Sequence, residues 1–324
     1  MTAITDDTVV IAPSRIGSGL ALAVVSAVSF GLSGSLAKGL LDAGWSPGAA
    51  VTARILIAAV VLAVPGALAL RGRWDLVRRN LGLFAVYGLV AVAGCQLAFF
   101  NAVDHMQVGV ALLIEYTAPV AVLGWHWIRH GRRPGRTTVS GALVAGIGLV
   151  LVLDLVSGAQ LSLVGVLWAL GAMVGVATFF VISADEDNGL PPIVLAAGGL
   201  LVGGFVLLLA GLLGVVPMTA STSTVVLAGA EVAWWVPVLL LGVVTAALAY
   251  AAGIAAGRRL GSRLASFVGL LEVVAALAFA WLLLGEIPRL VQLMGGVLIL
   301  AGVIVVRLGE REVSGPPVEA AALP

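Results

Sequence analysis

Charged residues are scarce in this chain. Only 10% of its 324 residues carry a charge, whereas a soluble domain carries about 25%. Such a chain cannot cover a water-facing surface with polar groups, so we expect a membrane protein that contacts the lipid bilayer. The net charge of +1 argues against a nucleic-acid partner. A single cysteine, Cys95, supplies neither a disulfide framework nor a zinc ligand set.

Signatures of catalysis and of nucleotide binding are also missing. The sequence contains no HExxH, no GxSxG and no paired-aspartate motif, which argues against an enzyme. The stretch GLSGSLAKG holds Lys38, but a phosphate-binding loop needs glycine directly before the lysine and serine or threonine after it. Here Ala37 precedes and Gly39 follows. ATP-driven transport by this chain alone is therefore excluded, and neither a cofactor nor a metal is expected.

Long apolar runs fill most of the chain. Hydrophobic residues make up 61% of it, and a membrane-spanning helix needs about 20 mainly apolar residues. The runs are continuous and not alternating, so the expected fold is an all-α membrane protein with ten transmembrane helices. The predicted spans are residues 17–38, 48–70, 81–102, 108–128, 138–156, 163–184, 191–214, 233–256, 264–284 and 289–308.

The basic residues predict how these spans are oriented. Fourteen of the 17 lysines and arginines lie near the two termini or in the loops after the second, fourth and eighth spans. Cytoplasmic loops carry the excess of basic residues, so both termini are predicted to be cytoplasmic. The membrane itself is interpreted as the cytoplasmic (inner) membrane of a bacterium. The first 15 residues make a poor signal peptide. Residues 1–15 and 309–324 are interpreted as cytoplasmic tails, the second of them disordered.

The two halves of the sequence resemble each other. A shift of 157 positions places Glu115 on Glu272, and it places GVALLIEYTAPVAVLGWHW on SFVGLLEVVAALAFAWLLL. Residues 16–157 and 158–308 are therefore predicted to be two five-helix repeats. Because five is odd, the second repeat enters the membrane from the opposite side. Inverted repeats are typical of secondary transporters, whose substrate site lies near the midplane where the halves meet.

Three charged residues lie deep inside the predicted spans, away from their ends. A charge at membrane depth costs at least about 2.5–3.5 kcal/mol, so it rarely faces lipid. Arg54 and Glu115 have opposite charge and similar depth, and we expect them to approach each other or to line one cavity that binds a substrate. The alternative is a buried ion pair that only fixes helix packing. Glu115 and Glu272 are also candidates for proton coupling, because a desolvated acid binds a proton more readily.

Other polar or aromatic residues are weaker candidates for the substrate cavity. Ser29 and Ser33 share a face of the first span with Ser26, although their hydroxyls could equally bond to their own helix. Pro119 frees the carbonyl of Glu115 from its helical hydrogen bond, or is an ordinary kink. The remaining candidates are Gln96, Trp168, Thr245 and Tyr250.

The repeat pattern resembles the EamA-type drug/metabolite transporter superfamily, over roughly residues 18–308. The most specific stretch is LLEVVAALAFAWLLLGEIPRLVQLMGGVLILAGVIVV, whose matching positions are Glu272, Gly285, Glu286, Gln292, Gly295 and Gly296. Two departures are Val273, where the family commonly has proline, and the absence of Gly-Glu after Glu115. The resemblance implies ten helices in two inverted repeats and transport without a cofactor.

Within this family, the first half is most similar to the threonine/homoserine exporter branch. The matching positions are Ser35, Leu36, Ala37, Lys38, Pro47, Gly48, Arg54, Ala111, Glu115 and Pro119. The sequence therefore predicts a secondary transporter that exports a small polar or zwitterionic metabolite, in particular an amino acid, by alternating access. The alternatives are proton-coupled efflux of hydrophobic or cationic drugs and a membrane scaffold that transports nothing. Assembly into a homo-oligomer is compatible with either reading.

Overall fold

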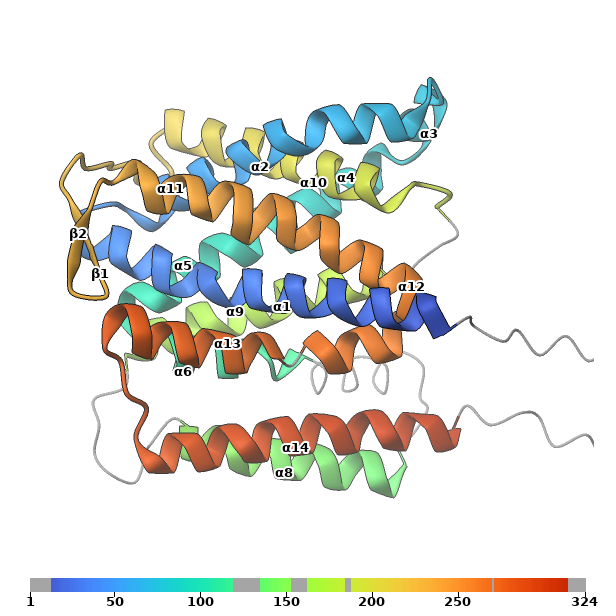
Figure 1. Cartoon of the computed structure of the whole chain (residues 1–324), viewed down its shortest axis with the longest axis vertical. Helices are drawn as coiled ribbons and strands as arrows, with labels where there is room; N and C mark the ends of the chain where they lie inside the picture. Colours follow the sequence, from blue (N-terminus) through green and yellow to red (C-terminus); the bar gives the residue numbers. More distant parts are fainter. Residues whose placement is uncertain (1–12, 119–134, 153–161, 184–187, 270, 314–324) are drawn as a thin grey trace, which may run out of the picture.

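The computed structural model describes residues 13–118, 135–152, 162–183, 188–269 and 271–313, which are mostly helical (Figure 1). The first half contains α1 (Pro13–Asp42), α2 (Pro47–Leu70), α3 (Trp74–Arg79), α4 (Leu81–Val86), the π-helix η1 (Tyr87–Gly94), α5 (Cys95–His105), α6 (Val108–Glu115) and α8 (Arg136–Val152). The second half contains α9 (Leu163–Ser183), α10 (Pro192–Leu212), β1 (Val225–Leu227), β2 (Ala230–Val232), α11 (Trp235–Gly242), η2 (Val243–Leu248), α12 (Ala249–Gly269), α13 (Leu271–Phe279), η3 (Ala280–Leu284) and α14 (Leu290–Val313).

The helical segments follow the predicted spans, although length alone supports only some of them. Five stretches are long and apolar enough to cross a membrane: Gly17–Asp42, Pro47–Leu70, Leu81–His105, Pro192–Leu212 and Trp235–Leu260. In four other predicted spans the apolar helical stretch is shorter, at Val139–Gly148, Leu163–Phe179, Leu271–Leu284 and Leu293–Gly302. The fourth predicted span continues beyond Ala118 into residues outside the described ranges. The chain is therefore a mostly helical protein with at least five membrane-spanning candidates.

The prediction of an all-α fold is wrong in one place. Strands β1 and β2 pair antiparallel between α10 and α11, with Val226 opposite Glu231. The two residues of the turn, Ala228 and Gly229, have positive φ angles of 52° and 75°, which suits the twist of a two-residue hairpin loop. The side chain of Leu227 packs next to Gly39 of α1. Packing against α1 stabilises a hairpin that would be marginal by itself.

Local sequence signals set both ends of α2, the helix that carries Arg54. Ser46 has extended backbone and its Oγ accepts a hydrogen bond from the backbone N–H of Ala49 at 3.3 Å. Pro47 occupies the first helical position, where its missing N–H costs nothing. At the other end Arg71 adopts left-handed backbone and its N–H donates to a carbonyl of the last turn. Arg54 consequently lies about two turns inside α2.

Helices of the two halves pack in a reciprocal pattern (Figure 1). Helix α2 packs on α10, α6 on α13 and α8 on α14, so the second, fourth and fifth spans each meet their own counterpart. The first span, α1, packs on η2 and α12 of the eighth, and the sixth span, α9, packs on η1 and α5 of the third. A twofold axis that relates the two five-helix halves produces this pattern. It maps each of the first three pairs onto itself, and it exchanges the last two pairs with each other.

Glycines allow the close packing of α9 and α10 on the third span. A Cβ atom added to Gly203 would lie 2.9 Å from the carbonyl oxygen of Gly88, and one added to Gly175 would lie 2.8 Å from the Cα atom of Cys95. Each of the two glycines lies four residues after another glycine, Gly175 after Gly171 and Gly203 after Gly199. In a membrane, where helices gain little from the hydrophobic effect, such close backbone approach is a main source of association.

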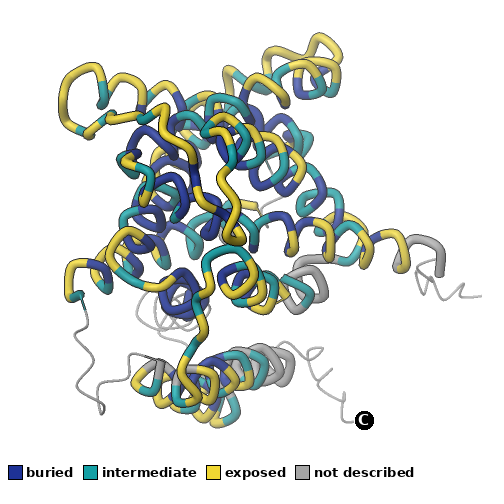
Figure 2. Tube along the Cα trace, turned by 60° about the vertical axis from the view of Figure 1, so that its left-hand side comes forward, coloured by how far each residue is buried: buried dark blue, intermediate teal, exposed yellow. Residues whose placement is uncertain are grey.

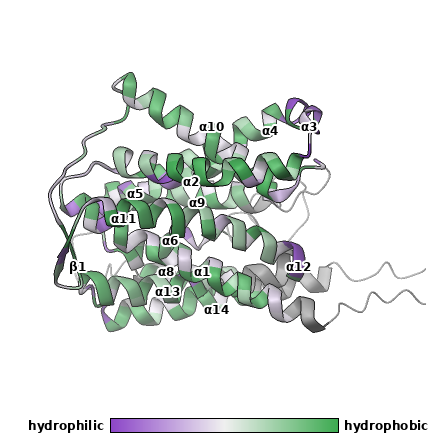
Figure 3. Cartoon of the chain, turned by 45° about the horizontal axis from the view of Figure 1, so that its top comes forward, coloured by the Kyte–Doolittle hydropathy of each residue, from purple (hydrophilic) through white to green (hydrophobic). Residues whose placement is uncertain are grey.

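Hydrophilic residues lie at both ends of the bundle, and hydrophobic residues dominate between them (Figure 3). The hairpin end holds β1, β2 and the linker before them, where Trp45 Nε1 donates to the carbonyl of Ser221 at 2.8 Å and Ala228 N–H donates to the carbonyl of Leu283 at 2.8 Å. The opposite end, called the arginine end here, carries Arg71, Arg73, Arg78, Arg79, Arg258 and Arg259. Between the ends, buried residues occupy the middle of the bundle and exposed ones its outer faces (Figure 2).

Candidate functional site

A small polar cavity lies in the middle of the bundle, between helices of both halves. Its volume is about 30 Å³, enough for a water molecule but far below the size of a typical small-molecule site. Both halves contribute to it, because α1, α2, α5 and α6 line it together with α13. The lining residues are Phe30, Gly31, Ser33, Gly34, Arg54, Gln96, Phe99, Val108, Leu112, Glu115, Glu272 and Ala276.

Arg54 is almost fully buried, with 2% of its surface exposed. Its Nη1 donates to Oε1 of Gln96, and its Nη2 donates to the backbone carbonyl of Thr245 at 2.8 Å. The guanidinium carbon lies 5.6 Å from the ring centroid of Phe100, within range of a cation–π contact. The Nε–H has no hydrogen-bond partner among the described residues. Two hydrogen bonds therefore hold Arg54, and its Nε is the nitrogen that has no partner among the described residues.

The carbonyl that Arg54 contacts belongs to the π-helical segment η2. Thr245 is fully buried and its own hydroxyl donates to the carbonyl of Leu241 at 2.8 Å. Segment η1 lies at the corresponding place of the first half, since a shift of 157 carries Tyr87 to Val244. Single π-helical turns within α-helices are frequent at functional sites. Here one of them supplies an acceptor for the buried cation.

Glu115 is the last residue of α6 and is 6% exposed. The thiol of Cys95 lies 3.7 Å from its Oε1, and the same sulfur lies 3.5 Å from the carbonyl oxygen of Ala172. Among the described residues no ion pair within 4.0 Å joins Glu115 to Arg54. Of the two arrangements expected for this pair, the structure has the second, in which both side chains line one cavity.

Glu272 faces the same cavity from α13. Its Oε2 accepts a hydrogen bond of 2.6 Å from the hydroxyl of Tyr116, the residue after Glu115. The cavity therefore holds two carboxylates, at corresponding positions of the two repeats, and one guanidinium. Counted from the proline that opens each helix, the position of α10 that corresponds to Arg54 is Gly199, which has no side chain.

The structure brings only some of the other candidate residues to the cavity. Ser33 and Gln96 line it, and the hydroxyl of Ser33 has no hydrogen-bond partner among the described residues. Ser29 is buried but is absent from the lining. Tyr250 is buried next to a lining residue, because the centroid of its ring lies 5.1 Å from that of Phe30. Pro119 lies outside the described residues.

Trp168, which the sequence suggested as a cavity residue, lies elsewhere in the structure. This residue of α9 is 38% exposed and does not contact the cavity. The aromatic side chains that line the cavity are instead Phe30 and Phe99. The sequence alone could not distinguish Phe30 and Phe99 from the aromatic residues that do not line the cavity. Tyr116 was also missed, although its place directly after the buried Glu115 is a signal that sequence reasoning could use.

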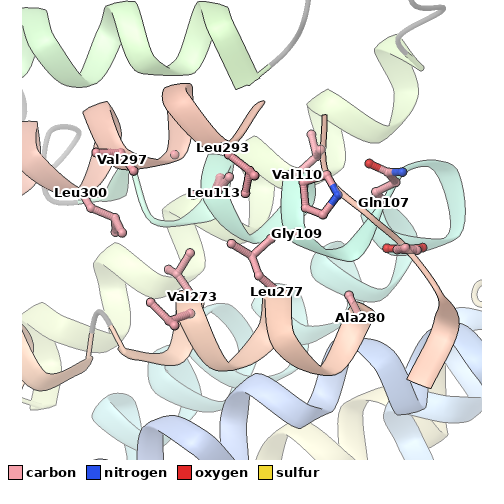
Figure 4. A pocket seen from close by; sticks show the side chains of 14 residues that line it. Gln107, Gly109, Val110, Leu113, Val273, Leu277, Ala280, Leu293, Val297 and Leu300 are labelled. Atoms are coloured by element: carbon pink, nitrogen blue, oxygen red, sulfur yellow. The ribbon is translucent and has the colours of Figure 1, made fainter. Parts of the chain in front are cut away.

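A larger cavity of about 170 Å³ lies between α6, α13 and α14 and is almost wholly apolar (Figure 4). Its polar residues, Gln107 and Glu286, lie at the hairpin end. Oε2 of Glu286 accepts a hydrogen bond of 3.1 Å from the backbone N–H of Val108 and so caps α6. Burial raises the pKa of the Glu286 carboxyl, which lies in the loop before α14. This cavity lacks the paired charges of the central one.

Comparisons with known proteins agree with this architecture. Twenty-four chains of solved structures match. One of them, described only as "Crystal structure of protein", is similar over 91% of this chain and 99% of its own, with a TM-score of 0.58 and 20% sequence identity. At that identity the likeness concerns the fold alone. A search of the curated proteins gave no match. The EamA-like transporter family matches residues 17–154 and again residues 163–308. With two copies of the family's domain spanning most of its length, the chain belongs to the EamA-like transporter family.

Proposed function

We propose that this protein is a secondary transporter that exports a small zwitterionic metabolite, an amino acid in particular, by alternating access. Family membership supports a membrane transporter. The observation that carries the substrate class is the meeting of Arg54, Glu115 and Glu272 at one cavity between the two repeats. Buried charges are retained where they meet a partner or a substrate.

The charges of the cavity match those of an amino acid. A substrate carboxylate would accept hydrogen bonds from the guanidinium of Arg54, whose Nε–H has no partner within the described part of the chain. A substrate ammonium group would donate to Glu115 or Glu272. Such charge-assisted hydrogen bonds are roughly twice as strong as neutral ones. Threonine and homoserine are the first solutes to test, because the sequence of the first half resembles their exporters.

The size of the cavity implies that the helices move during transport. Sites for small molecules typically measure about 300–1,000 Å³, whereas this one measures about 30 Å³. The cavity is too small for an amino acid, so the proposal requires the helices that line it to move apart when a substrate binds. The gathering of arginines at one end supports a cytoplasmic arginine end and an outward hairpin end. Export would then proceed from the arginine end to the hairpin end.

A second candidate function is proton-coupled efflux of a hydrophobic cation. The observation in its favour is that, among the residues that the structure describes, two carboxylates and one guanidinium face the cavity. In that case the cation would replace a proton on Glu115 or Glu272. Arg54 counts against it, because a nearby fixed cation repels a cationic substrate.

Transport by purified protein in proteoliposomes tests the proposal. We expect uptake of labelled threonine or homoserine, with a loss of at least about tenfold in Arg54→Gln and Glu115→Gln, the fold-change that one hydrogen bond to a charged group produces. Asp75→Asn, on the exposed helix α3, is the control. Running each assay with and without a pH gradient reveals proton coupling. Accumulation of a cationic dye without amino-acid uptake would favour the second candidate, and full activity of both cavity variants would refute the site.

A further inference from the structure

Helices α8 and α14 form a tight pair beside the rest of the bundle (Figure 1). A Cβ atom added to Gly148 of α8 would lie 2.6 Å from the carbonyl oxygen of Gly295, and one added to Gly302 of α14 would lie 2.6 Å from the carbonyl oxygen of Gly141. The backbones of the two helices therefore approach closely. Toward α6 and α13, by contrast, the side chains of α14 leave open the apolar cavity of about 170 Å³.

This cavity is long and narrow, because the residues that line it follow one another along the helices (Figure 4). Its lining extends from Gln107 to Leu113 beside α6 and from Leu293 to Leu300 on α14, which is about 10 Å at the rise of an α-helix. Dividing the volume by this length gives a cross-section of about 17 Å², which is that of a single extended aliphatic chain. The shape therefore suits a chain better than a compact solute.

The cavity opens to the outside of the bundle along the face between α13 and α14. Val274, Leu293 and Val297 line it and are also exposed, Val297 to 66%. This face belongs to the apolar stretches of the last two predicted spans, so the medium outside it is the acyl region of the bilayer. An apolar cavity of about 150 Å³ stays dry and takes up apolar ligands. In a membrane, the apolar molecules next to such an opening are lipid chains.

The polar residues of the cavity indicate the end at which a lipid headgroup would lie. Gln107 and Glu286 line the hairpin end, whereas Val273 and Leu300 line the opposite part. Trp281 of η3 is exposed at the hairpin end, and tryptophans of membrane proteins concentrate at the level of the headgroups. A chain that enters from this end would leave its headgroup beside Gln107 and Glu286.

We propose that this cavity binds one acyl chain of a membrane phospholipid, whose headgroup lies at the hairpin end. The chain fills the space that side chains leave open between the α8–α14 pair and the helices α6 and α13. The lipid is then a part of the packing of these helices. The site is separate from the proposed substrate site, because Arg54, Glu115 and Glu272 do not line it.

Photo-crosslinking in vesicles tests the site. The full chain is reconstituted into phosphatidylcholine vesicles that contain a phosphatidylcholine with a diazirine in one acyl chain, and adducts are mapped by peptide mass spectrometry after irradiation. Val110 and Leu113 line the cavity but are buried, so lipid on the outer surface of the bundle cannot reach them. We expect adducts on both residues. Leu68, which is exposed on α2, reports surface lipid and should be labelled in every variant.

Two variants fill the cavity and a third does not. Val297→Phe enlarges a lining side chain at the opening, and Gly296→Leu adds one inside, where a Cβ atom would meet the methyl groups of Leu113 at 3.3 and 3.4 Å. Each should lower labelling of Val110 and Leu113 by at least about tenfold, which corresponds to two methylene groups that are no longer buried. Met294→Phe, exposed on α14 but outside the lining, should leave this labelling unchanged.

Absence of adducts on Val110 and Leu113 while Leu68 is labelled would overturn the site. Equal labelling of the two buried residues in Val297→Phe and Met294→Phe would overturn it as well. If a diazirine fatty acid labels them and the phospholipid does not, the phospholipid is not the occupant. Size-exclusion elution in detergent checks that each variant is folded. None of these outcomes depends on transport, so the lipid site and the proposed function can fail separately.

Discussion

Arg54 of the first repeat and Thr245 of the second are joined through the guanidinium Nη2 and a backbone carbonyl 2.8 Å away. The same guanidinium donates to Gln96 within its own repeat. The cation therefore bridges the two halves at the depth of the cavity. If α2 and η2 separate, the hydrogen bond between Arg54 and Thr245 has to break. If the bond stays intact, η2 has to move together with α2. The buried charge is in this way connected to any movement of these helices.

We expect Arg54→Lys to reduce transport by at least about tenfold, because a lysine ammonium is a point charge that cannot reproduce the planar fork of donors. The measurement is the initial rate of uptake at saturating and at low substrate concentration. Folding is checked by size-exclusion elution in detergent. Full activity of the lysine variant would mean that positive charge alone is needed at this position.

Gly203→Ala should destabilise the protein by about 1–3 kcal/mol, the usual cost of forcing an extra group into a packed core. The added Cβ atom would lie 2.9 Å from the carbonyl oxygen of Gly88, so α10 and η1 must move apart. Gly146→Ala in α8 is the matched control, since its Cβ atom would meet nothing within 4 Å. Thermal unfolding in detergent compares the two. Equal midpoints would contradict the close packing.

Leu227→Ser should release the hairpin from α1, whereas Val226→Ser should not. The two neighbours in β1 differ in exposure, at 9% for Leu227 and 59% for Val226, so only the first loses buried apolar surface. Limited proteolysis of the linker between α10 and α11 is the readout. We expect faster cleavage in Leu227→Ser, and identical cleavage of both variants would show that the hairpin is not held by this side chain.

The pH dependence of stability should change in Glu286→Gln. Burial raises the pKa of Glu286 in the folded protein, so the folded state binds the proton more tightly than the unfolded state does. Its contribution to stability is complete below the unfolded value of about pH 4.3 and is lost as the pH rises through the folded pKa. The unfolding midpoint of the native chain, relative to Glu286→Gln, should therefore fall as the pH rises. Asp75→Asn is the control, and a difference independent of pH would contradict the sign.

The sequence alone predicted the apolar helices and the two repeats, because these features depend on hydrophobic runs and on residues that recur at a fixed spacing. The shift that superimposes Glu115 on Glu272 found the two carboxylates that line the cavity. Arg54 was recognisable as a charge that lipid would not tolerate. The sequence could place these residues inside the bundle because burying a charge or exposing a backbone in a membrane is costly whatever the details of packing.

Features that depend on packing between distant segments were not predictable. The contact between Tyr116 and Glu272 depends on how α6 meets α13, and the hairpin of β1 and β2 depends on burial against α1. The π-helical segments could not be predicted, because their apolar sequences are equally compatible with an α-helix. Trp168 shows the converse, since a large aromatic residue in a span faces outward as readily as inward.

The single guanidinium has a consequence for the orientation of a bound solute. A cavity with perfect twofold symmetry would accept a dipolar molecule equally well in two opposed directions. Because Gly199 stands where a second arginine would be, the two directions are unequal here. A solute held by Arg54 would therefore keep one orientation throughout transport, while access to the cavity changes from one side of the membrane to the other.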